Sequence, residues 1–310
     1  MTTNLGATTS RRTPQHRPVT ERRTPMIESI VVGMEPGSLL DDVTEIALQL
    51  AILHDTPLRA VYVEDTDLLR ASYAAPFPAL PPEGPIPMDP NASRDLEAKF
   101  HDEERELGRR FLKLISDFRI RGSFRVERGS VTDVLVEESR AHDLIVLGKS
   151  GASDGGPDSP LGDHVESVTR QAYCPVLVVP PDGQIGNRIL VAYDGSVVSH
   201  RALTTAARLA KVHDAVVRVI VVAEEEEGYD LLGKANSYLE SHELTAELER
   251  RMGSPAEIIL EEATRWDARI LAMGAFGHGR ISQLFGRAAT HRILESVDRV
   301  ALLCGPQVAA

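Results

Sequence analysis

Short apolar runs alternate with longer amphipathic stretches along the chain from residue 29 onward. The apolar runs are rich in Val, Ile and Leu, which predicts strands buried on both faces of a sheet, and the stretches between them show the three- and four-residue spacing of helices. In the first half, expected strands lie at 29–33, 58–63, 124–127, 144–147 and 175–179, and expected helices at 42–53, 94–118, 131–140 and 163–171. Strands that alternate with helices predict parallel pairing with right-handed crossovers, and therefore an α/β fold.

The chain contains an internal repeat. ALQLAILHDTPLRAVYV (47–63) aligns without a gap with AARLAKVHDAVVRVIVV (206–222), at an offset of 159 residues. GSVTDVLVEE from Gly129 matches GSPAEIILEE from Gly253 at a smaller offset of 124, so the first half carries an insertion between the two blocks. A repeat of this length predicts two copies of one fold. We expect two tandem, open, five-stranded, parallel, doubly wound sheets, one over 26–182 and one over 187–306.

Two further segments lack the strand and helix pattern. Residues 1–25 are rich in Thr, Arg and Pro, which predicts a disordered basic tail, either an arm for RNA or an acidic partner or a segment upstream of a true start at Met26. The insertion at 64–94 has too many prolines for a helix or an inner strand. It either covers the first half's site, docks a partner, or is a plain surface loop.

Composition and charge narrow the function classes. The net charge of −12 argues against nucleic acid as a partner of the folded body. No apolar run reaches the roughly 18 residues that a membrane span needs, and the N-terminal arginines flank no apolar core of a secretory signal. We therefore expect a cytoplasmic protein with no membrane partner. Cys174 and Cys304 each lie in an apolar stretch, which favours small buried thiols over a disulfide.

A glycine loop separates a strand from a helix within RILAMGAFGHGRISQLFGRAATHR (269–292). Gly274 and Gly277 end the apolar run, and helical spacing begins near Gly286. Glycines allow the backbone to approach a bound group, and the free amides of a helix N-terminus favour a phosphate. Two glycines alone are equally compatible with a tight turn.

A carboxylate follows the first strand of the second half. Asp194 lies in ILVAYDGS, and Glu35 is its counterpart in the first half. Because ligands of open α/β sheets bind at the carboxyl ends of the strands, Asp194 and the glycine loop are expected at one edge. The Asp194 carboxylate can accept hydrogen bonds from a base or a sugar. It is also a good turn and helix-start residue, and the sequence leaves both interpretations open.

The paired halves, with ILVAYDGS and MGAFGHGR, resemble the tandem universal stress proteins over nearly all of 26–306. The resemblance implies an adenine nucleotide alpha hydrolase-like fold, a role in the stress response, and edge-to-edge pairing of 175–179 with 300–303 in a pseudo-dimer. ATP-binding members of the family carry Gly, two residues, Gly, nine residues, and then Gly followed by Ser or Thr. The resemblance therefore implies adenine and ribose near Asp194 and Val222, and the phosphates of ATP, with Mg²⁺, on the glycine loop.

The second half departs from the family pattern. Gly274 and Gly277 match, but Arg287 stands at the last glycine position, Gly286 comes one residue early, and no Ser or Thr follows. Arg287 either donates to a phosphate or fills the pocket. The run Glu224–Glu227 follows the second strand and is either a solvated loop or a group of carboxylates that repels a triphosphate. His278 and Arg280 offset part of that charge, and His278 is not expected to be catalytic.

The first half departs further. Gly148 and Gly151 match the pattern, but Gly162 follows after ten residues, and Asp163 then places a negative charge where a phosphate would lie. Glu35 replaces the aspartate and reaches further into any base site. We expect ATP to bind in the second half and not in the first.

Few features of the sequence support other classes of function. The sequence shows no nucleophile with an adjacent base and no set of His and Cys residues at metal-ligand spacing. We therefore expect that the protein is not an enzyme and holds no resident metal. Slow ATP hydrolysis is left open. GxGxxG does not follow a first strand, and no P-loop occurs. The alternative function is a stress adaptor that binds no ATP and acts as a scaffold for a protein or lipid ligand. Pairing of the two halves is expected within the chain, and a homodimer is left open.

Overall fold

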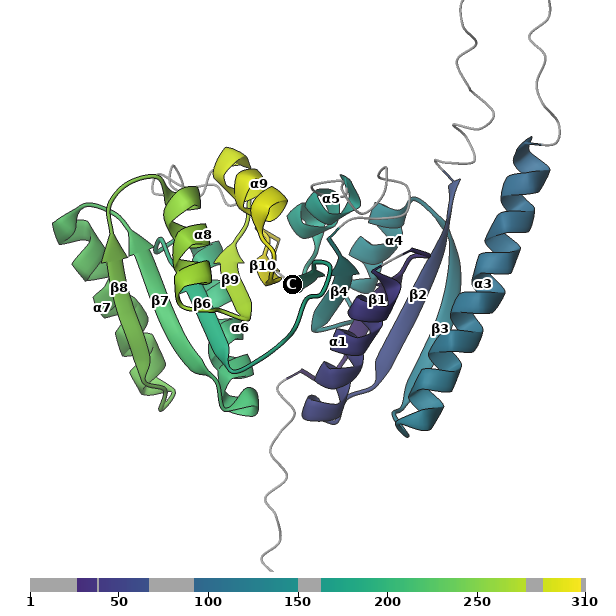
Figure 1. The fold of residues 1–310 in the computed structure, drawn as a ribbon, viewed down its shortest axis with the longest axis horizontal. Coiled ribbons are helices and arrows are strands. Elements are labelled where there is room, and N and C mark those ends of the chain that lie inside the picture. The colour runs from purple at the N-terminus through teal and green to yellow at the C-terminus, as the bar shows by residue number, and fades with distance from the viewer. Residues whose placement is uncertain (1–26, 38, 67–91, 150–162, 277–286, 308–310) are drawn as a thin grey trace, which may run out of the picture.

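The computed structural model describes residues 27–37, 39–66, 92–149, 163–276 and 287–307. Its strands form a single ten-stranded sheet in the order β3-β2-β1-β4-β5-β10-β9-β6-β7-β8. Figure 1 shows the two halves side by side, with the first half in purple to teal and the second in green to yellow. The predicted basic tail (1–25) and most of the predicted insertion (64–94) lie outside the described residues.

The first half contains five strands and four helices among its described residues. In chain order they are β1 (Ile30–Met34), α1 (Leu40–His54), β2 (Leu58–Asp65), α3 (Ala92–Asp117), β3 (Gly122–Gly129), α4 (Val131–Glu138), β4 (Leu144–Gly148), α5 (Asp163–Gln171) and β5 (Val176–Val179). These elements confirm the predicted order. β3 is longer than the predicted 124–127, because it is a partly exposed edge strand whose ends carry no apolar run.

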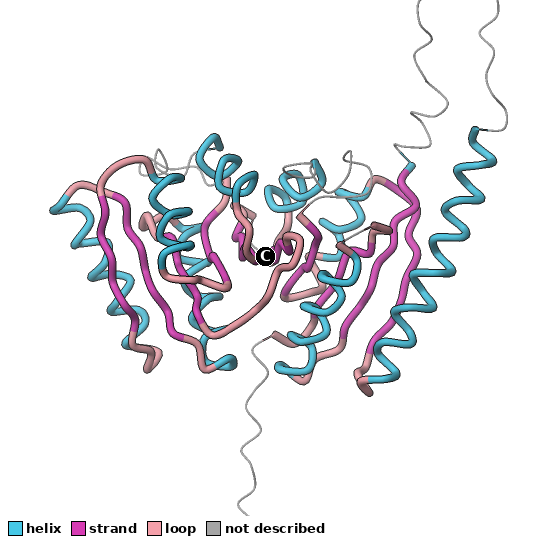
Figure 2. The backbone as a smooth tube through the Cα atoms, viewed as in Figure 1, coloured by secondary structure: helices cyan, strands magenta, loops and turns pink. Residues whose placement is uncertain are grey.

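The second half repeats the same order. Its elements are β6 (Arg188–Ala192), α6 (Val197–His213), β7 (Val216–Val222), α7 (Glu225–Ser241), β8 (Ala246–Arg251), α8 (Pro255–Arg265), β9 (Ile270–Gly274), α9 (Arg287–Ser296) and β10 (Val300–Cys304). Figure 2 shows the alternation of strand and helix in both halves. Every strand pairing within a half is parallel, as the alternating pattern predicts.

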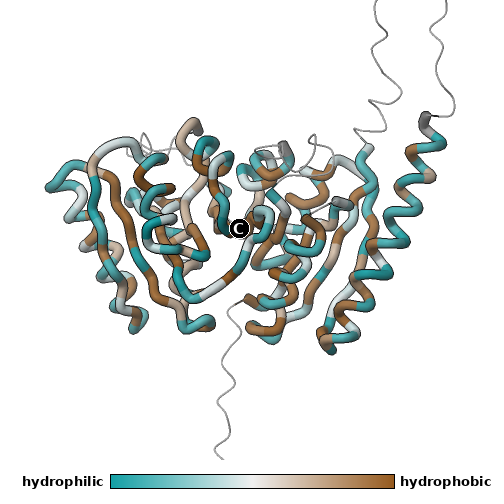
Figure 3. The backbone as a smooth tube through the Cα atoms, viewed as in Figure 1, coloured by the Kyte–Doolittle hydropathy of each residue, from teal (hydrophilic) through white to brown (hydrophobic). Residues whose placement is uncertain are grey.

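Helices cover both faces of the sheet. One core packs α1, α3, α6 and α7 against the sheet, and the other packs α4, α5, α8 and α9 against the opposite face. Successive residues of a strand enter opposite cores, so Ile30 and Val32 face one and Val31 the other. Strand β7 is therefore mostly apolar, while edge strand β8 is polar, a contrast visible in Figure 3. Each core continues from one half into the other.

The two halves meet through an antiparallel strand pair. Leu302 of β10 faces Leu177 of β5, with Ala301 facing Val178 and Leu303 facing Val176. This confirms the predicted edge pairing and the pseudo-dimer. It joins two five-stranded sheets into one and leaves only β3 and β8 as edges. In the described part of the chain, no helix is long and apolar enough to cross a membrane.

Candidate nucleotide site

Three strands of the second half end together at the carboxyl edge of the sheet. Ala192 of β6 faces Ile220 of β7 on one side and Met273 of β9 on the other. Asp194, Val222 and Gly274 follow these residues by one or two positions, so the structure brings these three predicted site residues to one edge. Val222 is buried at the end of its strand, as Gly274 is at the end of β9.

Asp194 is the most unusual polar residue of this edge because its side chain is buried, with 1% of the residue exposed. Its Oδ1 accepts a hydrogen bond from the Ser196 amide at 3.0 Å, which closes the turn after β6. Its Oδ2 is buried and has no hydrogen-bond partner among the described residues. The predicted turn role therefore accounts for one carboxylate oxygen, and no contact within the described part of the chain accounts for the other.

The helix that follows Asp194 begins with a side-chain cap. Ser196 is the N-cap of α6, and its Oγ accepts a hydrogen bond from the Ser199 amide at 3.2 Å. Gly195 has φ +74°, and a Cβ there would lie 2.5 Å from Cδ2 of Leu231 on α7. Glycine is required at this position because the turn is left-handed and α7 packs closely against it.

Gly274 also has a packing role. A Cβ at Gly274 would lie 2.6 Å from the Ser199 nitrogen and 2.7 Å from Cγ2 of Val198. The missing side chain thus lets the end of β9 lie against the first turn of α6. The predicted approach of this glycine to a bound group is not needed to explain its presence, since the contact with α6 already requires it.

The glutamate run after β7 is the start of a helix. Glu224 is the N-cap of α7, and Glu225, Glu226 and Glu227 form its first turn, all exposed. The prediction that this run forms a loop is therefore wrong, and the prediction that its side chains are solvated is confirmed. Acidic side chains suit this position because the helix N-terminus carries a partial positive charge, a preference that apolar periodicity does not reveal.

Arg250 lies beside the same turn. Its Nη1 donates to the Ala223 carbonyl oxygen at 3.2 Å, and its guanidinium lies 5.3 Å from the centroid of the Tyr229 ring. Gly228 makes room for it, because a Cβ there would lie 2.6 Å from Cδ of Arg250. This arginine follows the acidic run by more than 20 residues, so sequence spacing gave no signal for it.

The glycine loops themselves fall outside the described residues. Gly277, His278 and Gly286 belong to this group in the second half, as do Gly151 and Gly162 in the first. Arg287 is the first described residue of α9, the helix that follows the loop in the chain. Gly148 ends β4 and Asp163 begins α5, in positions that match the second half.

The corresponding edge of the first half is apolar. Glu35 is exposed, whereas its counterpart Asp194 is buried. Leu40 occupies the position of Ser199 at the offset of 159, and Met34, Leu39 and Leu40 are all buried. Helix α1 begins with Leu39 as its N-cap, without a side-chain cap. Among the residues that the structure describes, the first half therefore has no counterpart of the buried Asp194 carboxylate or of the Ser199 hydroxyl in this turn.

A lysine of the first half contacts the helix that follows the second half's loop. Lys149 Nζ donates to the carbonyl oxygens of Glu295 and Val297, each at 2.8 Å, at the C-terminus of α9. Burial lowers the pKa of Lys149, while Asp298 and Glu295 oppose that shift. A cation is favourable at a helix C-terminus. The position of α9 thus depends on both halves.

The two cysteines are free and buried, as predicted. Burial raises the pKa of the Cys174 thiol to about 12 and that of the Cys304 thiol to about 11. Both side chains are therefore protonated thiols at neutral pH, and neither is suited to act as a nucleophile.

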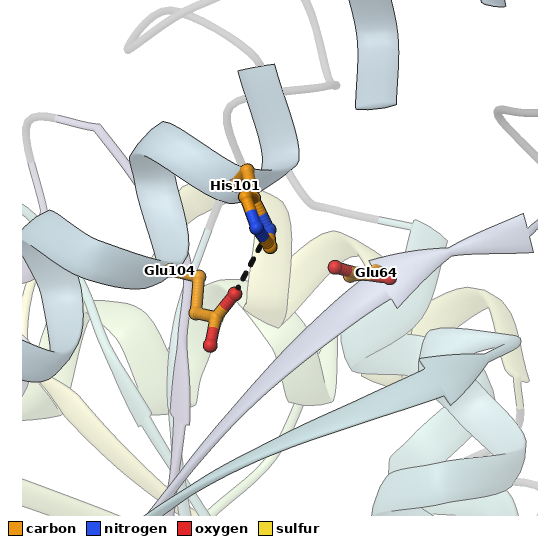
Figure 4. Close-up of side chains that lie close together, drawn as sticks. All are labelled: Glu64, His101 and Glu104. Atoms are coloured by element: carbon orange, nitrogen blue, oxygen red, sulfur yellow. Dashed lines mark ion pairs between the residues drawn. The ribbon is translucent and has the colours of Figure 1, made fainter. Parts of the chain in front are cut away.

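A cluster of possible metal ligands lies at the end of β2, as Figure 4 shows. Ligand atoms of Glu64, His101 and Glu104 lie within 4.8 Å of one another, and His101 Nδ1 is 3.3 Å from Glu104 Oε2. The His101 side chain is 70% exposed, and Arg128 lies 3.9 Å from Glu64. The cluster is an exposed ion-pair group. Sequence spacing missed it because the insertion separates β2 from α3.

Comparisons with known proteins agree on one family. The model of the universal stress protein family matches residues 26–180, 186–247 and 222–299. A universal stress protein of Synechocystis is 29% identical over 173 residues, covering 55% of this chain and 60% of that protein. One of Methanocaldococcus jannaschii is 26% identical over 156 residues, covering 50% of this chain and 82% of that protein.

Solved structures share the fold. A universal stress protein from Archaeoglobus fulgidus superposes with a TM-score of 0.67 at 17% identity, covering 90% of this chain and 96% of that one. A second protein, from Pseudomonas aeruginosa, gives a TM-score of 0.58 at 16% identity, covering 91% of this chain and 95% of that one. Both neighbours extend over the two halves.

Proposed function

Because the chain belongs to the universal stress protein family, we propose that it acts in the stress response as a cytoplasmic protein whose second half binds an adenine nucleotide with Mg²⁺. The proposed site lies at the carboxyl edge formed by β6, β7 and β9. Adenine and ribose lie near Asp194 and Val222, and the phosphates lie on the loop before α9.

The observation that carries this proposal is the buried Oδ2 of Asp194, which has no hydrogen-bond partner among the described residues. A buried carboxylate oxygen without a donor costs about 1–3 kcal/mol or more, so such an atom is expected to have a use. The adenine amino group and the ribose hydroxyls are both donors of the required kind. Oδ1 of the same carboxylate is held by the Ser196 amide, which fixes the direction of Oδ2.

The start of α9 supports phosphate binding. Arg287 is the first described residue of α9, which follows the glycine loop in the chain, and the free amides of a helix N-terminus favour an anion. Lys149 at the opposite end of α9 complements the helix dipole, so α9 is held in place with its N-terminus at the loop.

The first half is proposed not to bind a nucleotide. Its edge offers an exposed Glu35 and the buried side chains of Leu39 and Leu40, where the second half offers a buried carboxylate and Ser199. An exposed carboxylate is a poorer acceptor for a base than a buried one, because water competes for its hydrogen bonds. We propose no catalytic role, since the thiols of Cys174 and Cys304 are protonated and buried.

Isothermal titration of Mg-ATP into the full-length protein tests the proposal. Asp194→Asn is the sharpest variant, because the amide oxygen keeps the turn to Ser196 while an NH₂ donor replaces Oδ2. We expect one site per chain in the wild type, an affinity at least tenfold weaker in Asp194→Asn, and no change in the control Glu35→Gln. An absence of binding in the wild type overturns the nucleotide proposal and favours the adaptor. Equal losses in both variants contradict the placement in the second half.

A further inference from the structure

A cavity of about 430 Å³ lies between the two halves, away from the carboxyl edge of β6, β7 and β9. Its first-half wall is formed by the turn after α4 and by the residues that precede β5, and its second-half wall is one face of α6. It shares no residue with the proposed nucleotide site. Its volume falls within the range of small-molecule pockets, about 300–1,000 Å³, and such pockets are frequent where two domains meet.

Three arginines line this seam cavity, one from the first half and two from the second: Arg140, Arg201 and Arg208. Arg140 is anchored on Tyr173, since its Nη2 donates to the Tyr173 hydroxyl at 2.7 Å and its guanidinium lies 4.0 Å from the ring centroid. Its Nε faces Glu137 at 3.1 Å, an exposed ion pair that solvent screens.

Within the described part of the chain, the Arg201 guanidinium bonds carbonyl groups and forms no ion pair with a carboxylate. Its Nη2 donates to the Tyr173 carbonyl oxygen at 3.2 Å, and its Nη1 donates to the carbonyl oxygens of Gly305, at 2.7 Å, and Gln307. These contacts hold the guanidinium across the seam between the two halves. Carbonyl dipoles satisfy its donors but leave its net charge in place.

Arg208 is on the same side of α6, two turns further along the helix. It makes no ion pair or hydrogen bond with any residue that the structure describes, and it is exposed. A guanidinium carries five donors in a planar fork, which matches the oxygens of a phosphate or carboxylate. Arg208 therefore has its full donor set available at the cavity wall.

The arginines outnumber the acidic residues of the wall, three to one. Asp143 is the carboxylate among the lining residues, and its Oδ2 accepts hydrogen bonds from the amides of Glu28 at 2.9 Å and Ser29 at 3.0 Å and from the Ser29 hydroxyl at 3.1 Å. His142 is also in the wall, and its Nδ1 lies 2.8 Å from the Glu138 carbonyl oxygen and 3.3 Å from Oε2 of the same residue. The cavity is thus lined by more positive than negative charge, in a chain whose net charge is −12.

We propose that this seam cavity is a binding site for a small anion that carries more than one phosphate or carboxylate group. Arg208 binds the anion through its free guanidinium fork, and Arg140 and Arg201 supply positive charge from the two sides of the seam. Because the arginines come from both halves, the bound anion links the halves and stabilises their pairing. This inference is independent of the nucleotide proposal.

Pyrophosphate is the probe for phosphate groups, and citrate is the probe for carboxylate groups. Each is titrated separately into the full-length protein by calorimetry at constant ionic strength. Arg208→Gln is the test variant, because Arg208 holds no internal contact whose loss would disturb the described fold. Arg125→Gln on edge strand β3 is the matched control, since Arg125 is also exposed and without a described partner. Asp194→Asn separates this cavity from the proposed nucleotide site.

We expect saturable binding of at least one probe at one site per chain, with an affinity at least tenfold weaker in Arg208→Gln and unchanged in Arg125→Gln and Asp194→Asn. Binding of pyrophosphate alone or of citrate alone supports the site and identifies its chemistry. The proposal is overturned if neither probe binds, if Arg208→Gln binds as tightly as the wild type, or if Asp194→Asn abolishes binding.

Discussion

His54 and His213 occupy equivalent positions in the two repeats, and their imidazole rings meet with centroids 5.9 Å apart. They are the last residues of α1 and α6, which pack against each other across the seam. His54 is 4% exposed, and neither of its ring nitrogens has a partner among the described residues, nor does Nε2 of His213. The pair thus places two titratable rings inside the contact between the halves.

Acidification is predicted to weaken the protein through this pair. Burial, together with the charge of His213, lowers the pKa of His54 from 6.5 to about 4, and burial lowers the pKa of His213. The unfolded chain therefore binds protons between pH 6.5 and 4 that the folded chain does not, so stability is full above this window and falls as pH decreases through it. For His54 the loss between pH 7.5 and pH 5 is about 2 kcal/mol.

Urea unfolding at pH 7.5 and pH 5 measures this effect. His54→Leu is expected to reduce the difference in unfolding free energy between the two pH values by about 2 kcal/mol. His101→Gln, which removes an imidazole that is 70% exposed, is the control and should change the difference much less than His54→Leu does. An equal pH dependence in wild type and His54→Leu would show that the pair does not couple to folding.

Removal of the Lys149 ammonium is predicted to weaken the link between the halves. Lys149→Met leaves the Glu295 and Val297 carbonyl oxygens without their donor, at a cost of about 1–3 kcal/mol in unfolding free energy. Lys113→Met is the control, because Lys113 is 70% exposed and pairs only within its own helix. Chemical denaturation checks both variants, and a loss no larger than that of Lys113→Met would contradict the assigned role.

Glu262 is predicted to be the most sensitive acidic residue of the second half. It is 2% exposed on α8 and pairs with Arg218 of β7 and with Arg265, whose Nε donates to it at 2.8 Å. Glu262→Gln removes the counter-ion that these arginines share, while Arg218 keeps Glu247 and Arg265 keeps Glu249, so the expected cost is about 1.5–3 kcal/mol. Thermal and urea unfolding test this value. Glu257→Gln, an exposed partner of Arg292, should cost less than about 1 kcal/mol, and a similar cost in both variants would contradict the prediction.

The sequence predicted the parts of the fold that depend on local pattern. Apolar runs and helical spacing located the strands and helices, and the repeat indicated two copies of one fold, because burial on a sheet imposes the same periodicity in both copies. The run from Glu225 to Glu227 was assigned to a loop because polar residues carry no apolar period, although a helix N-terminus favours them.

Side-chain contacts between segments far apart in the chain could not be predicted from the sequence. The seam cavity joins Arg140 to Arg208, and the ion-pair cluster joins Glu64 to His101, in both cases through tertiary packing that no motif spacing encodes. The position of the proposed nucleotide site was predictable, because parallel strands end at one edge of the sheet. The sequence did not predict that Asp194 is buried while its counterpart Glu35 is exposed. This difference depends on how helices α6 and α1 begin.

Photo-labelling with azido-ATP and Mg²⁺, followed by mass spectrometry of tryptic peptides from the full-length protein, tests most directly whether the two repeats have diverged in nucleotide binding. We predict that the label is found on peptides of the second half, within 188–304. Unlabelled ATP should compete with this labelling, and the Asp194→Asn variant should not be labelled there. Label on first-half peptides, within 27–179, at a comparable yield would contradict it.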